Sequence, residues 1–408
     1  MEMAGWFSYL DSQLSAGGRG MVMKLNIENF KRMNDLFGSE YCDELLKTIM
    51  DYLDQQTGSR VFRNVGVEFI VVMQYRSVQD ARELAEKLME RFQKSWSVGD
   101  KKCFCSIQIA LCEYPGFASN ANDMLKCLEL AMLRGMEQGS NQIVLYDQEL
   151  HGHCTRRQAI AENLGAALEK NEVEVCYRPV YDTEKQAYMR AELLMRVHIQ
   201  GVGMVDSAEF LPIAEDIGQA RQVEEYALKQ AARGIDRLLK EGKQFESISV
   251  EVSPSLLQQG DFVDEISGLM DEYKFPPKKL ALEIDEYAAS TAYCDISVLL
   301  QNLSWLGVEL ILGNFGSGST GLSWIFELPV DTLEFGRMFM WQLEHNPKTA
   351  PINEGLVQIA KRMNKKIMAS CVETQQQKDM LDAFGCNMQQ GAYYTPLISE
   401  EELGKLLK

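Results

Sequence analysis

The feature that most limits the fold of this chain is a regular alternation in its second half. Short apolar runs typical of strands are separated there by longer segments with helical spacing, such as 221–240 and 293–305. Eight strands separated by helices over about 250 residues predict a (β/α)8 barrel, whose site residues lie where strands end and loops begin. The expected strands are 173–180, 189–197, 246–253, 280–285, 307–313, 331–334, 365–370 and 386–391.

The first half has a different order of elements. Strand-like and helical runs follow one another as strand, helix, two strands, helix, strand, helix and strand, which predicts a compact α/β domain with a mixed central sheet. Polar residues 148–158 indicate a linker, so we expect domains at 1–150 and 151–408. The expected elements are 22–27, 31–54, 60–64, 67–73, 78–94, 103–112, 121–138 and 142–147.

Charge and composition exclude several classes of protein. With 59 acidic and 41 basic residues the formal net charge is −18, which disfavours polymeric nucleic acid as a partner but leaves small anionic ligands open. The sequence has neither an apolar run long enough to span a membrane nor a secretory signal. The ten scattered cysteines read as reduced thiols, so we expect a cytoplasmic protein. His151, His153 and Cys154 lack a second half-site, which favours a polar segment over zinc.

Two series of motifs carry a family resemblance. In the first half, Asn29–Asp35 with Gly38 and Asp43, followed by Arg63–Phe69, resembles the diguanylate cyclase (GGDEF) domain. The second half resembles the EAL-type cyclic-di-GMP phosphodiesterase domain, in the order and spacing of its motifs. These are Glu192-Leu193-Leu194-Met195-Arg196, Phe210–Glu215, Leu282–Glu286, Phe315–Gly318, Val372–Thr374 and Gln390-Gly391. The usual opening before the first strand is missing, which indicates a chain shortened at its N-terminus.

The resemblance implies metal-dependent cyclase chemistry in the first half, yet the residues for it are replaced. The two metal-binding acids correspond to Asn26 and Val67, the first glycine of the signature loop to Val65, and a phosphate-binding lysine to Met136. We therefore expect no cyclase activity, and Glu68 alone is no evidence of catalysis. The guanine-facing pair, Asn34 and Asp43, is kept. These two residues either form a residual base pocket or are structural, and the structural interpretation is favoured.

The resemblance implies a two-metal phosphodiesterase centre in the barrel, and here too the pattern is broken. The family's asparagine, paired aspartates, lysine and later acids correspond to Glu251, Gly313 with Asn314, Glu334, Gly336 and Ser370. The remnants are Glu192, Glu283, Glu373 and Gln390, together with Arg196, which meets the ligand's phosphate in the family. We expect no metal site, with magnesium binding lost, and no catalytic residue.

The replacements crowd acids at the barrel mouth without a metal to offset them. Buried like charges either raise one another's pKa or pair with cations. Arg178 stands where the family usually has glutamine. We therefore expect Arg178 and Arg196 to pair with these acids as structural cations.

Three functions remain open from the sequence. The first is an inactive regulatory receptor that binds cyclic-di-GMP at the barrel mouth through Arg196, Gln390 and Arg178. The second is a protein-interaction scaffold with both nucleotide pockets empty, and the third is a residual phosphodiesterase. Arg196 and Gln390 favour the receptor, whereas Glu251 and Glu334 oppose an anionic ligand. The long barrel helices are compatible with a homodimer, and the sequence identifies no protein partner.

Overall fold

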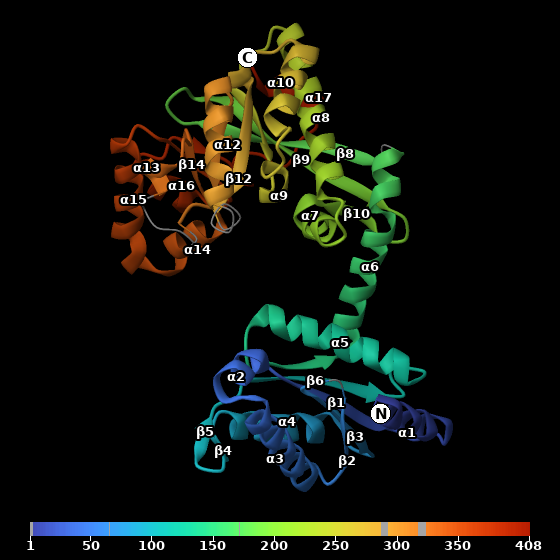
Figure 1. The fold of residues 1–408 in the computed structure, drawn as a ribbon. Coiled ribbons are helices and arrows are strands. Elements are labelled where there is room, and N and C mark those ends of the chain that lie inside the picture. The colour runs from blue at the N-terminus through green and yellow to red at the C-terminus, as the bar shows by residue number, and fades with distance from the viewer. Residues whose placement is uncertain (1–2, 65, 171, 287–292, 317–323) are drawn as a thin grey trace. The chain divides into compact units, whose positions relative to one another are not determined.

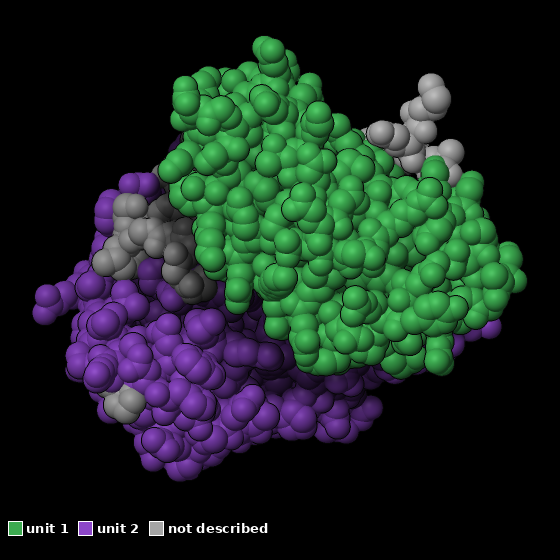
Figure 2. Space-filling view, turned by 90° about the horizontal axis from the view of Figure 1, so that it is seen from below, with its two compact units in different colours: residues 1–156 green, residues 157–408 purple. Residues whose placement is uncertain are grey.

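The structure, a computed structural model, describes residues 3–64, 66–170, 172–286, 293–316 and 324–408 (Figure 1). The chain divides into two compact units, residues 1–156 and 157–408 (Figure 2). No helix in the described ranges is long and apolar enough to cross a membrane.

Unit 1 is built on a five-stranded mixed sheet, as the sequence predicts. Its strand order is β2-β3-β1-β6-β7, in which β1 runs antiparallel to both β3 and β6, and β7 runs parallel to β6. The central strand β1 is buried almost throughout because its alternate side chains enter cores on both faces. The strands are β1 Gly20–Ile27, β2 Arg60–Arg63, β3 Glu68–Gln74, β6 Ile107–Tyr114 and β7 Ile143–Tyr146.

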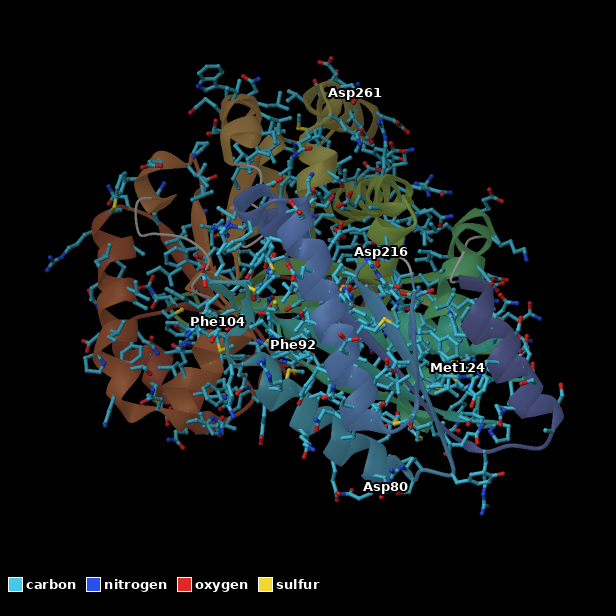
Figure 3. The ribbon with its side chains drawn as sticks, turned by 60° about the horizontal axis from the view of Figure 1, so that its bottom comes forward. Asp80, Phe92, Phe104, Met124, Asp216 and Asp261 are labelled. Carbon is cyan, nitrogen blue, oxygen red and sulfur yellow. The ribbon has the colours of Figure 1, made fainter. Side chains whose placement is uncertain are left out.

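Helices cover both faces of this sheet. Phe92 of α4 belongs to the core that also takes in α3, and Met124 of α5 belongs to the core that takes in α1 (Figure 3). The single helix expected at 31–54 is instead two helices, because Gly38 between them has φ 86°, outside the helical region. The helices are α1 Met3–Ser15, α2 Phe30–Phe37, α3 Ser39–Thr57, α4 Val78–Phe92 and α5 Ala121–Gln138, with a small hairpin of β4 Trp96–Val98 and β5 Lys101–Cys103.

The expectation that 148–158 is a non-helical linker is wrong, because helix α6 (Gln148–Glu169) runs through the whole segment. The two units nevertheless divide inside this segment, after Arg156. Its first turns pack on unit 1 through Leu150 and Cys154, whereas Ile160 and Leu164 are buried in the core of unit 2. Each half of the helix therefore has its own i, i+4 apolar pair, and the polar residues between them hid the helical period.

Unit 2 is the expected eight-stranded barrel. Strands β9, β11, β12, β13, β14, β15 and β16 are parallel neighbours, and β8 closes the barrel between β16 and β9. β8 is antiparallel to both neighbours, since only the short stretch 183–186 joins it to β9 and a parallel crossover needs a dozen or more residues. The strands are β8 Val173–Asp182, β9 Ala187–Ile199, β11 Ser247–Glu251, β12 Leu280–Asp285, β13 Glu309–Gly313, β14 Thr332–Phe335, β15 Lys366–Ala369 and β16 Met388–Gln389.

The barrel helices pack their apolar faces against these strands in one core. The sequence did not indicate the short strand β10 (Gly203–Asp206), which pairs with the end of β9, nor α14. The helices are α7 Ser207–Asp216, α8 Ala220–Lys240, α9 Pro254–Leu257, α10 Phe262–Tyr273, α12 Tyr293–Leu306, α13 Trp324–Glu327, α14 Arg337–His345, α15 Ala350–Arg362, α16 Gln375–Phe384 and α17 Glu400–Leu406. Two 3-10 turns lie at Pro277–Lys279 and Pro347–Thr349.

Candidate functional site

The expected site residues of the barrel gather at one end, where the parallel strands finish. Glu251 ends β11, Glu283 lies near the end of β12, Gly313 ends β13, and Gln390 directly follows β16. Parallel strands present their carboxyl ends to the same edge of a barrel, so these side chains share one mouth.

Glu192 lies at the centre of a buried network in this mouth. Its Oε2 atom accepts hydrogen bonds from Arg178 Nη1 at 3.1 Å and Gln390 Nε2 at 3.1 Å. Register explains the first contact, because Arg178 on β8 lies directly opposite Glu192 on β9. The expectation that Arg178 pairs with a mouth glutamate is confirmed. Burial still raises the pKa of Glu192, and the charge of Arg178 and the amide of Gln390 counteract that rise.

Glu283 and Glu334 form a second cluster beside this network. Burial raises the pKa of both carboxyl groups, and repulsion between neighbouring carboxylates adds to it. The pKa of Glu283 is raised further, because the neighbouring Glu334 carboxylate favours the protonated form of Glu283. Gln390 Nε2 also contacts Glu334 Oε1 at 3.4 Å. Arg178 and the Gln390 amide are thus the groups that offset the negative charge of Glu192 and Glu334.

Glu251 ends β11 and is exposed at the mouth. The surrounding protein, and then repulsion from Glu192 and Asp285, raise its pKa to about 7. Both effects favour the protonated form of Glu251.

Neighbouring side chains fill the space left at two family acid positions. A Cβ atom built on Gly313 would lie 2.7 Å from Glu283 Oε1, and one built on Gly336 would overlap Asn314 Oδ1. Asn314 is held in place by a 2.8 Å hydrogen bond from its Nδ2 to Asp285 Oδ2. As the side chains now stand, neither position has room for the aspartate of the family pattern.

The expectation that Arg196 pairs with the mouth acids is wrong. Its Nε donates to Asp206 Oδ1 at 2.8 Å, and the side chain is 36% exposed. Asp206 comes from β10, the strand that the sequence did not indicate. Arg196 lies on the same face of β9 as Glu192, four residues further along, and only its Nε is bonded to a described residue.

Two further remnants lie at the ends of β15 and β16. Gln390 is fully buried in the network described above. The Glu373 side chain is exposed and has no hydrogen bond or ion pair to another described residue, and only its backbone N–H is held, by Gln377 Oε1 at 2.7 Å. Ser317 and Gly318 of the Phe-Gly-x-Gly motif lie outside the described residues, and so does any contact between Glu373 and that loop.

In unit 1 a buried lysine forms an ion pair with Glu68, the acid that remains in the signature loop region. Lys24 on β1 is 1% exposed and forms ion pairs with Glu68 on β3, at 2.9 Å, and with Glu129 on α5. Glu68 also accepts a hydrogen bond of 2.8 Å from Asn64 Nδ2. These contacts give Glu68 a structural role. The signal for it in the sequence is a lysine in a mainly apolar strand. Val65 lies outside the described residues.

The guanine-facing pair of the family lies on two different helices. Asn34 is half-buried on α2, where its carbonyl oxygen accepts the N–H of Gly38 at 2.9 Å and ends the helix. Asp43 is exposed on α3. The base-pocket interpretation of these two residues remains a prediction.

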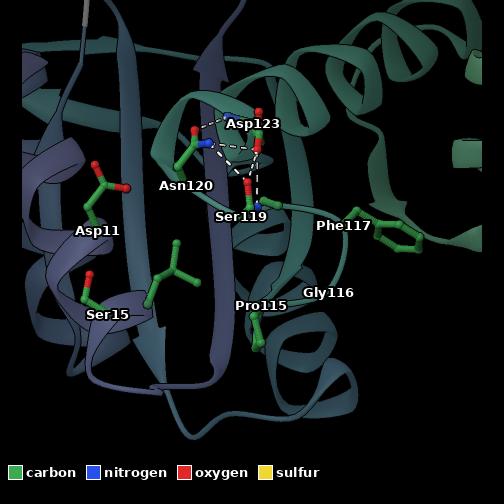
Figure 4. A pocket seen from close by; sticks show the side chains of 10 residues that line it. Asp11, Ser15, Pro115, Gly116, Phe117, Ser119, Asn120 and Asp123 are labelled. Atoms are coloured by element: carbon green, nitrogen blue, oxygen red, sulfur yellow. Dashed lines mark hydrogen bonds between the residues drawn. The ribbon is translucent and has the colours of Figure 1, made fainter.

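A separate hollow of about 640 Å³ lies in unit 1, between the end of α1 and the start of α5 (Figure 4). Its polar groups bond to one another: Asp123 accepts from Ser119 and Asn120, and Asp11 accepts the first N–H of α5 from Ala121 at 2.7 Å. Three of the first four N–H groups of α5, those of Ala121, Asp123 and Met124, therefore have acceptors within the protein.

The residues of the mouth do not fit the two-metal centre that the resemblance implies. Two such ions need many oxygen ligands, whereas Glu192 is bound to Arg178 and Gln390, and glycine stands at two acid positions of the family pattern. Burial and neighbouring carboxylates also raise the pKa of Glu283, which favours its uncharged form. Among the described residues, no group of three or more His, Cys, Asp or Glu side chains has a metal-binding arrangement.

A mixed-sheet domain followed by a barrel with an antiparallel first strand and an acidic mouth defines a tandem of the GGDEF and EAL type. The family model described as "EAL domain" matches residues 161–396, and "Diguanylate cyclase, GGDEF domain" matches residues 6–142. The chain belongs to the EAL domain family and carries a GGDEF domain in front of the barrel.

Relatives with this arrangement are found in bacteria. The bifunctional diguanylate cyclase/cyclic di-GMP phosphodiesterase MucR of Pseudomonas aeruginosa is 27% identical over 375 residues, covering 91% of this chain and 55% of MucR. The cyclic di-GMP phosphodiesterase NbdA of the same species is 26% identical, covering 94% of this chain and 50% of NbdA. The chain thus spans about half the length of these curated relatives.

Solved structures share the barrel. The PaMucR phosphodiesterase in complex with c-di-GMP is 29% identical, with a TM-score of 0.57, and covers 60% of this chain and 99% of that chain. The FimX EAL domain from Pseudomonas aeruginosa bound to c-di-GMP is 21% identical, with a TM-score of 0.54, and covers 59% and 96%. The second likeness concerns the fold alone.

Proposed function

We propose that the barrel is a receptor that binds cyclic-di-GMP without hydrolysing it, so that the chain acts in cyclic-di-GMP signalling as a regulatory protein. The observation that carries this proposal is the engagement of Glu192. The glutamate that opens the EAL-type motif is bound by Arg178 and by Gln390, each at 3.1 Å.

Hydrolysis of a phosphodiester by this family's chemistry needs a metal-activated water and positive charge at the phosphate. In this mouth Arg178 neutralises Glu192, and burial with carboxylate repulsion raises the pKa of Glu283 and Glu334. The remaining carboxylates therefore do not form a centre that could activate water, although the barrel that surrounds them is complete.

Binding without cleavage makes fewer demands on the mouth. Arg196 is half-exposed, and Asp206 engages only its Nε, so the two terminal nitrogens remain to donate to phosphate oxygens. The raised pKa of Glu251, about 7, lowers the cost of bringing an anion past it. Because the mouth keeps several acids, we expect weak binding, micromolar at best, or about −8 kcal/mol.

The relatives support the same ligand class. The PaMucR structure holds c-di-GMP and is the more similar of the two solved structures, and MucR itself is described as having both enzymatic activities. This chain keeps the barrel but differs from the family pattern at Gly313, Gly336 and Glu334. That difference favours a receptor over an enzyme.

Isothermal titration calorimetry with cyclic-di-GMP, with and without magnesium, tests the proposal. We expect metal-independent binding that Arg196→Ala weakens by roughly 1.5–3 kcal/mol, the cost of losing a hydrogen bond to a charged group. Arg233→Ala, which removes an exposed arginine from α8, is the matched control and should leave binding unchanged. Glu334→Lys should strengthen binding.

Two results would contradict the receptor. Binding that needs magnesium, or that survives Arg196→Ala unchanged, would show that the mouth contacts the ligand differently. Failure to bind even in the Glu334→Lys variant would favour a protein-interaction scaffold.

A further inference from the structure

The end of the barrel opposite the mouth carries two adjoining hollows. They measure about 480 and 240 Å³ and share Glu246 and Lys366 in their walls. Residues at the beginnings of β11 to β15, together with the turn between β8 and β9, line them. The larger hollow falls within the usual size range of small-molecule sites.

Every acid in these walls already has a partner. Arg190 Nη2 donates to Glu246 Oε2 at 2.6 Å, and Arg190 Nη1 donates to Glu309 Oε2 at 2.6 Å. Lys366 Nζ donates to Glu309 at 3.1 Å, and Lys185 pairs with Glu246. The other three acids accept hydrogen bonds at 2.6–3.0 Å: Asp331 from Leu310 N, Asp182 from Glu184 N and Lys185 N, and Glu184 from Asn387 Nδ2.

Four lysines in the same walls contrast with these acids. Lys278, Lys279, Lys361 and Lys365 form no ion pair with any carboxylate among the described residues, and we call them the basal lysines. Lys279 Nζ donates to Phe245 O and lies 4.2 Å from the centre of the Phe245 ring, while Lys365 Nζ donates to Val330 O at 2.6 Å.

Nearby carboxylates offset the charge of two basal lysines only in part. Burial lowers the pKa of Lys279, and repulsion from Lys278 lowers it further, against the attraction of Glu246. Burial also lowers the pKa of Lys365, against the attraction of Asp331. Charges at this end of such barrels usually serve stability, and paired charges fulfil that role. Lys279 and Lys365 also donate to backbone carbonyls, but none of the four has an ion-pair partner among the described residues, in a chain with 18 more acids than bases.

We propose that the basal lysines bind a small ligand that carries a pyrophosphate group. Lys278 and Lys279 line the larger hollow, and Lys361 and Lys365 line the smaller one. Two linked phosphates can therefore meet one pair of lysines each. Ammonium groups bind phosphate oxygens through charge-assisted hydrogen bonds. The phosphates would thus give the basal lysines the anionic partners that no carboxylate supplies.

Calorimetry of the full chain with inorganic pyrophosphate, in magnesium-free buffer of fixed ionic strength, tests this site. We expect binding with a Kd on the order of 100 µM. Lys278→Gln combined with Lys361→Gln should weaken it at least tenfold, since both side chains are exposed and their loss should not disturb folding. Lys240→Gln combined with Lys405→Gln removes the same charge from exposed, paired lysines elsewhere on the barrel and should leave binding unchanged.

The remaining outcomes separate this site from the mouth. Saturating cyclic-di-GMP and the Arg196→Ala variant should both leave pyrophosphate binding intact, whether or not the proposed receptor function holds. No binding of pyrophosphate, or equal weakening by the two double variants, would overturn the proposal. Tighter binding of hexaglutamate than of pyrophosphate would also overturn it, in favour of an acidic peptide.

Discussion

Replacing Arg178 by methionine should destabilise the barrel, because it leaves Glu192 buried without its cation. The two groups lie 3.1 Å apart, with Arg178 33% and Glu192 11% exposed. Breaking a fully buried pair costs about 3–5 kcal/mol, and exposed pairs contribute less than about 1 kcal/mol. The partial exposure of Arg178 places the expected loss between these limits, at about 2 kcal/mol.

A double-mutant cycle separates the pair from other effects of the substitution. Glu192→Gln removes the charge that Arg178 neutralises, so Arg178→Met should cost much less in that background, and we expect a coupling energy of about 1–2 kcal/mol. Arg196→Met is the matched control. Its partner Asp206 is 66% exposed, so its loss should cost less than about 1 kcal/mol.

Amide hydrogen exchange of β8 and β9 at increasing urea is the suitable assay, because it measures the opening of the barrel without requiring the two units to unfold together. Equal destabilisation by Arg178→Met and Arg196→Met, or a coupling energy near zero, would refute the view that Arg178 is the structural cation of the mouth.

Two further predictions concern packing and pH. Gly336→Ala should destabilise the barrel by about 1–3 kcal/mol, because the new methyl group overlaps Asn314. Adding Asn314→Gly should restore most of that loss. Equal melting temperatures of Gly336→Ala with and without Asn314→Gly would disprove the overlap. Burial alone would raise the pKa of Glu246, but Lys185 and Arg190 lower it to about 2. Because its pKa is lower in the folded state, ionised Glu246 stabilises the fold above the unfolded-state pKa of about 4.3. This stabilisation is lost as the pH falls toward 2. The stability of β11 by hydrogen exchange should therefore fall over this range, and Glu246→Gln should flatten the slope; an unchanged slope would contradict it.

The sequence predicted the arrangement of strands better than the contacts between them. Alternation located all eight barrel strands, and the resemblance to the EAL domain identified the mouth residues at their ends. The Arg178–Glu192 pair was also predictable, because both residues lie on long strands whose neighbourhood follows from the fold.

Contacts made by short or irregular elements could not be predicted. Arg196 pairs with Asp206 because the four-residue strand β10 adds to β9, and four residues are too few to show a period. The overlap between Asn314 and a Cβ atom at position 336 depends on the side-chain conformation of Asn314, which the sequence does not reveal. In α6 the helical period was hidden because two different cores take up its two apolar pairs.

The central claim is that this barrel binds without cleaving, and an assay of cyclic-di-GMP hydrolysis tests it most directly. The purified chain is incubated with cyclic-di-GMP and magnesium or manganese, and the linear dinucleotide product is measured by chromatography against the Glu192→Gln variant. We predict no turnover in either protein at any metal concentration, because Glu192 is engaged by Arg178 and two acid positions are glycine. Metal-dependent turnover that Glu192→Gln abolishes would contradict the account.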